Sequence, residues 1–237
     1  MFDPDAFEIV LRILHAQAHK LSKEVSLTTT TKLAIIADDL RCGDPIAPFV
    51  QHWASKNDFW AESAAYGNLI QKIFICSVFQ LKERFPSVTH KLIIRCLTRV
   101  PALGLPIDPS ILRAIEEKRV SVMKEFFTHL YAVERELQDD ALCWECRAQN
   151  IGYLKYNLHL HQLPTSETSD QWDKITCVAL RQKLTKFMYA TRVGCTYQAG
   201  KKHPSFKTQI AAALKVFQSP DEALDLSSFL NTAVVAE

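Results

Sequence analysis

Apolar residues recur every three or four positions along most of the chain, which is the spacing of an amphipathic α-helix. The first such segment opens with Asp3 and Pro4, a pair typical of a helix start, and its pattern predicts a helix over about residues 4–24. A second predicted helix stops at Gly43. The most apolar segment, from Asp58 to about Phe85, predicts a helix at the buried centre of the fold.

The second half of the chain continues the helical pattern. Asp108–Ser110 predict the start of a long helix that ends near Gln138, and a later helix is expected over residues 171–194. Residues 154–160 alternate between apolar and polar, which is the period of a strand. No other segment alternates convincingly enough to pair with them, so a helix is favoured there. The pattern as a whole predicts an all-α, multi-helix fold of roughly eight to ten helices.

One polar segment, residues 164–170, interrupts the helical pattern and is the best candidate for a domain boundary. It divides the chain into a larger N-terminal lobe, residues 1–163, and a smaller basic C-terminal lobe, residues 164–237, which ends in an apolar arm. The two lobes are either separate domains or parts of one continuous domain.

Charge is distributed unevenly along the 237 residues, although the formal net charge is only +2. No Asp or Glu lies between Asp173 and Asp221, and this acid-free stretch holds nine of the 28 basic residues. The rest of the chain therefore holds 19 basic and 26 acidic residues. Such asymmetry favours an anionic partner or an acidic neighbouring subunit.

The acid-free stretch is the candidate site for nucleic acid. It combines cations, glycines and aromatic side chains, including Tyr189 and Phe206 as possible stacking surfaces, and these are the groups that bind a phosphate backbone and unpaired bases. The predicted contacts there are Arg181, Lys183, Lys186, Arg192, Tyr197, Lys201, Lys202 and Lys207. A second set with helical spacing, expected to form the opposite wall of a groove, is Lys91, Arg95 and Arg99. The alternative interpretation is that these cations are solvated or complement the acidic part of the same chain.

The sequence does not favour a metal site. Cys143 and Cys146 have metal-ligand spacing, and His159 and His161 follow them, so the four could hold zinc if residues 154–161 were extended. On a helix the two histidines would point apart. Phosphate-binding, dinucleotide-binding and hydrolase motifs are missing from the sequence, so no cofactor, no enzymatic activity and no small-molecule ligand are expected.

Composition sets the expected environment. Hydrophobic residues make up 48% of the chain, enough for a core, and charged residues 23%, so disorder is not expected over most of it. Seven cysteines without a disulfide-framework spacing favour a reducing compartment. No signal-peptide pattern and no apolar run of about 18 residues are present, so we expect a soluble, cytoplasmic protein without a membrane partner.

Two functions fit these expectations. The first is a non-enzymatic assembly protein that binds single-stranded RNA without sequence preference and self-associates through its apolar terminal segments. It would act like a nucleoprotein or coat protein, by analogy of fold class alone. The alternative is a helical protein–protein adaptor whose basic surface meets an acidic partner.

Overall fold

A computed structural model of the chain is all-helical over the residues it describes, with ten α-helices and no strand. This confirms the predicted all-α fold. None of the helices in the described part of the chain is both long enough and apolar enough to cross a membrane. The described residues are 2–55, 57–60, 65–96, 100–138, 144–165, 175–189, 206–215 and 223–230.

The chain forms two compact units. The first consists of Met1–Ile93, Val100–Glu116 and Ala223–Glu237, and the second of Ile94–Arg99 and Glu117–Glu222. The long helix α6, Pro109–Gln138, begins in the first unit and contributes most of its length to the second. The predicted boundary at residue 164 lies within the second unit.

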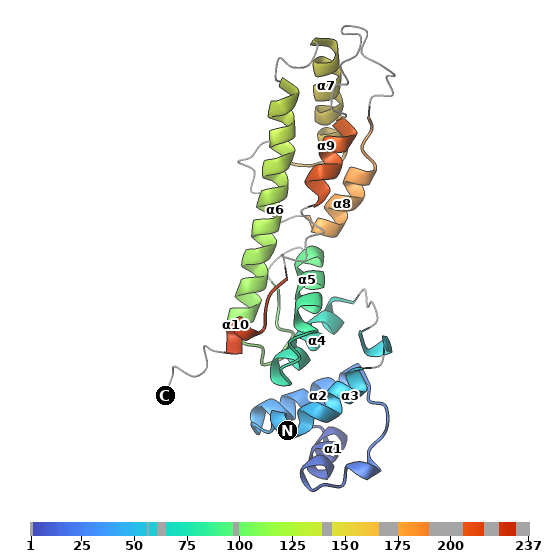
Figure 1. Ribbon diagram of the computed structural model, residues 1–237, viewed down its shortest axis with the longest axis vertical. Coiled ribbons are helices and arrows are strands. Elements are labelled where there is room, and N and C mark those ends of the chain that lie inside the picture. The colour runs from blue at the N-terminus through green and yellow to red at the C-terminus, as the bar shows by residue number, and fades with distance from the viewer. Residues whose placement is uncertain are drawn as a thin grey trace. The chain divides into compact units, whose positions relative to one another are not determined.

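The first unit is built around α4, Tyr66–Val78, whose middle is buried on nearly every side, as its apolar sequence predicts. Helix α2, Leu27–Asp39, packs against both α4 and α1, Pro4–Leu14 (Figure 1). The remaining elements that lie wholly or largely in this unit are the helices α3, Gly43–Ala54, α5, Phe85–Arg95, and α10, Ser227–Leu230, and the short 3₁₀ helices Ala18–Lys20 and Asn57–Trp60.

The segment around α10 packs on its own chain. The Leu224 N–H donates to the Thr89 hydroxyl at 3.3 Å, and the Phe229 ring lies 6.1 Å from the Phe85 ring, centroid to centroid. Leu226 is fully buried. This part of the predicted C-terminal arm is therefore engaged within the protomer, while residues 231–237 lie outside the described residues.

The second unit combines the later part of α6 with α7, Trp144–Leu160, α8, Cys177–Thr185, and α9, Phe206–Ala213 (Figure 1). Its core is mostly apolar, with Arg119 and Asn157 also buried, and draws on all four helices. The buried side chains include Met123, Phe126, Phe127, Leu130, Leu154, Leu158, Leu180, Leu184 and Ile210.

Several helices end earlier than the sequence pattern predicts. The helix expected over residues 4–24 stops at Leu14, because Ala16 adopts a left-handed backbone with φ of 57°. Its N–H bonds to the Ile13 carbonyl at 3.0 Å and the Gln17 N–H to the Arg12 carbonyl at 2.7 Å, which closes the helix.

Left-handed residues also follow two other helices that end earlier or elsewhere than predicted. Arg41, with φ of 51°, follows the end of α2, so Gly43 begins α3 instead of stopping the preceding helix. Gln80, with φ of 52°, follows the end of α4. The single helix expected from Asp58 to Phe85 is therefore a 3₁₀ turn and α4, and Phe85 already belongs to α5.

Candidate nucleic-acid interface

The candidate interface begins with α8, the first described helix of the acid-free stretch. The Thr176 hydroxyl accepts a hydrogen bond from the Ala179 N–H at 2.9 Å and caps the helix, while Leu180 and Leu184 are buried. The helix ends at Thr185, so the prediction of a helix continuing to residue 194 is wrong.

The residues after α8 are held to α7 by one buried side chain. Asn157 is fully buried, its Nδ2 donates to the Met188 carbonyl at 2.7 Å, and its Oδ1 accepts from the Met188 N–H at 2.8 Å. Because Met188 bonds to a side chain instead of to helical backbone, the segment leaves the helical path. Met188 is 42% exposed.

Aromatic contacts fix the same segment on both sides. The Phe187 ring stacks on the His161 imidazole with centroids 5.5 Å apart and planes 11° apart. The half-buried Tyr189 ring lies 5.4 Å from the Phe206 ring of α9, and burial raises the pKa of the Tyr189 hydroxyl. Phe206 is itself buried, so its expected role as a stacking surface for bases is wrong.

Two cations of the acid-free stretch flank the contact between the Tyr189 and Phe206 rings in sequence. Lys186 lies three residues before Tyr189, and Lys207 directly follows Phe206 at the start of α9. Arg181 lies on α8, one turn before the segment.

The charge of the exposed cations in this region is not neutralised by the described residues. Arg181, Lys186 and Lys207 are all exposed, and none pairs with a carboxylate in the part of the chain that the structure describes. Lys155, by contrast, pairs with Glu134 at 2.5 Å. Uncompensated positive charge on a surface attracts anions.

Lys183, another predicted RNA contact, bonds to the backbone of its own chain. Its Nζ donates to the His161 carbonyl at 2.6 Å, just beyond the C-terminal end of α7. An ammonium at this position is stabilised by the negative end of the helix dipole. The contact joins α8 to α7 and leaves Lys183 less available than its exposed neighbours for a bound anion.

The other predicted contact residues lie on α5 or outside the described residues. Lys91 and Arg95 are half-buried on α5, and Lys91 belongs to the first unit. A groove that joins Lys91 to the cations of the second unit stays a prediction. The predicted residues outside the described ranges are Arg99, Arg192, Tyr197, Lys201 and Lys202.

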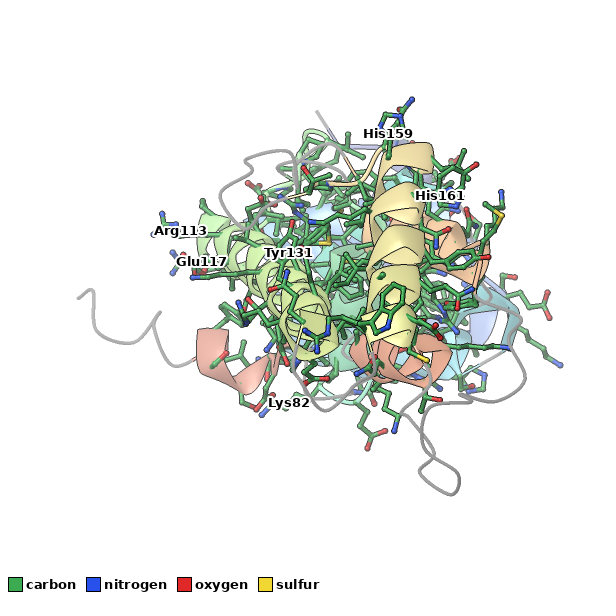
Figure 2. The ribbon with its side chains drawn as sticks, turned by 90° about the horizontal axis from the view of Figure 1, so that it is seen from above. Lys82, Arg113, Glu117, Tyr131, His159 and His161 are labelled. Carbon is green, nitrogen blue, oxygen red and sulfur yellow. The ribbon has the colours of Figure 1, made fainter. Side chains whose placement is uncertain are left out.

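Three of the four candidate zinc ligands, Cys146, His159 and His161, lie on α7 or just after it. Helix α7 continues to Leu160, so the extended geometry that a zinc site would need is not present (Figure 2). His159 is exposed on the last turn, whereas His161 stacks on Phe187. Cys146 is on α7, and Cys143 lies outside the described residues. Among the residues described, no three His, Cys, Asp or Glu side chains cluster as metal ligands would.

Sequence reasoning missed a pocket of about 450 Å³ in the first unit, between the end of α3, Trp60 and the connection from α4 to α5. The Arg84 guanidinium lies 5.5 Å from the centre of the Trp60 ring, and the Trp60 Nε1–H donates to the Ala54 carbonyl at 2.5 Å. Lys82 and Glu83 also line it. The lining comes from turns whose proximity no local pattern indicates, and the mixed charges favour no single ligand.

No protein-family model, curated protein or solved structure matches this chain. The function must therefore be argued from the surface chemistry of the protein itself.

Proposed function

We propose that the protein is a non-enzymatic RNA-binding assembly protein. It binds single-stranded RNA without sequence preference through the exposed cations of the second unit, and its copies associate with one another. The observation that carries the RNA-binding part is the set of Arg181, Lys186 and Lys207, which are exposed and have no described carboxylate partner.

Such a surface suits a phosphate backbone for a thermodynamic reason. Each phosphate that a lysine or arginine neutralises releases condensed counterions from the RNA, and this release drives binding without reference to sequence. Cations already paired with carboxylates would gain much less, because binding RNA would require those pairs to break.

Rigidity of the supporting segment adds to the argument. The bonds from Asn157 to Met188 and the two ring contacts anchor residues 187–189 to α7, His161 and α9 in the absence of a ligand. A surface whose backbone is already ordered loses less conformational entropy on binding. The partly exposed Tyr189 ring is the described aromatic group closest in sequence to Lys186 that a base could contact.

The test compares two triple variants that each remove three positive charges. The first is Arg181→Gln, Lys186→Gln, Lys207→Gln. The matched control is Lys20→Gln, Lys82→Gln, Arg113→Gln, which changes exposed cations of the first unit. Binding of a single-stranded RNA of about 20 nucleotides is measured by fluorescence anisotropy at low salt.

We expect the first variant to bind RNA more weakly than the control variant, with unchanged helical content by circular dichroism. The log–log dependence of affinity on salt should also flatten by about 2, since each phosphate contact to single strands contributes about 0.7. Equal loss in both variants would mean that net charge alone, and not this surface, controls binding.

The alternative, a helical adaptor for an acidic protein, is favoured by one observation: large apolar side chains, including Trp144 and Tyr156, are exposed on α7. An adaptor should bind an acidic polypeptide such as polyglutamate and fail to bind RNA at low salt. The proposed RNA-binding protein should instead bind RNA at low salt and fail to bind polyglutamate.

A further inference from the structure

We draw no further inference here: the strongest candidate, the pocket of about 450 Å³ between the end of α3, Trp60 and the connection from α4 to α5, is lined by the exposed Lys82, Glu83 and Arg84, whose mixed charges point to no one class of ligand, and nothing in the described part of the chain shows what fills it.

Discussion

Replacing Asn157 by leucine should destabilise the segment that carries the candidate interface. Leucine has the same number and branching of side-chain heavy atoms but can make neither of the hydrogen bonds to Met188, which measure 2.7 and 2.8 Å. Each bond contributes about 1 kcal/mol net. The N–H and carbonyl of Met188, both partly buried, would lose their partner, at about 1 kcal/mol or more for each group. The expected loss is therefore about 2–4 kcal/mol.

Amide hydrogen exchange at Met188 reports this loss at the site itself. A destabilisation of 2–4 kcal/mol corresponds to exchange roughly 30 to 1,000 times faster, since about 1.4 kcal/mol is a factor of ten. The control is Gln182→Leu, at an exposed position of α8, which should change exchange at Met188 by less than threefold, or about 0.6 kcal/mol. A change of less than tenfold in Asn157→Leu would refute the view that this side chain holds residues 187–189 in place.

Three further predictions concern stability and reactivity. Ala16→Gly should stabilise the protein by up to about 1 kcal/mol in urea unfolding, because glycine adopts the left-handed backbone without the clash of a Cβ atom; destabilisation would contradict this. The hydrogen bond from Lys32 lowers the pKa of the folded-state Asp3 carboxylate below 3.8. The ionised Asp3 therefore stabilises the protein above pH 3.8, and this stabilisation is lost as the pH falls through the lower pKa of the folded state. Thermal melts should accordingly show Asp3→Asn less stable than the unaltered chain at neutral pH, with the difference vanishing in strong acid; a difference independent of pH would oppose this. Burial raises the pKa of the Cys76 thiol, so iodoacetamide should label the half-exposed Cys146 first by peptide mass spectrometry, and equal labelling rates would argue against the buried position.

Helix starts could be predicted from sequence where the capping group is local. Asp3 accepts a hydrogen bond from the Ala6 N–H at 3.1 Å, three residues away, and the helix after it begins at Pro4 as expected. Likewise α6 occupies Pro109–Gln138, the range that its cap and apolar stripe predict. Such signals depend on neighbouring residues only, so they are visible in a single sequence.

Helix ends could not be predicted in the same way. Ala16, Arg41, Gln80 and Gln162 each follow a helix and have left-handed backbones, yet none is glycine or asparagine, the residues that usually indicate such an end. All four are exposed, and each helix is closed by a hydrogen bond from the N–H of the following residue to the carbonyl five positions before it. A pattern that requires glycine at the stop therefore extends the helices too far, as it does for the helix that ends at Leu14.

The candidate interface was predictable in its charge but not in its structure. The acid-free stretch is visible in the sequence, and it identifies Arg181, Lys186 and Lys207. The bonds from Asn157 to Met188 join residues 31 positions apart, and Lys183 reaches the carbonyl of His161, 22 positions away. Partners so distant in sequence leave no local signal, because they meet only once the helices have packed.

Salt dependence of RNA binding by the unaltered protein tests the proposed function with the fewest assumptions. If Arg181, Lys186 and Lys207 each neutralise a phosphate, the logarithm of the affinity for single-stranded RNA should fall with the logarithm of salt concentration with a slope of about −2 or steeper. Absence of binding at low salt, or binding whose affinity does not change with salt, would contradict a surface that recognises RNA through its phosphates.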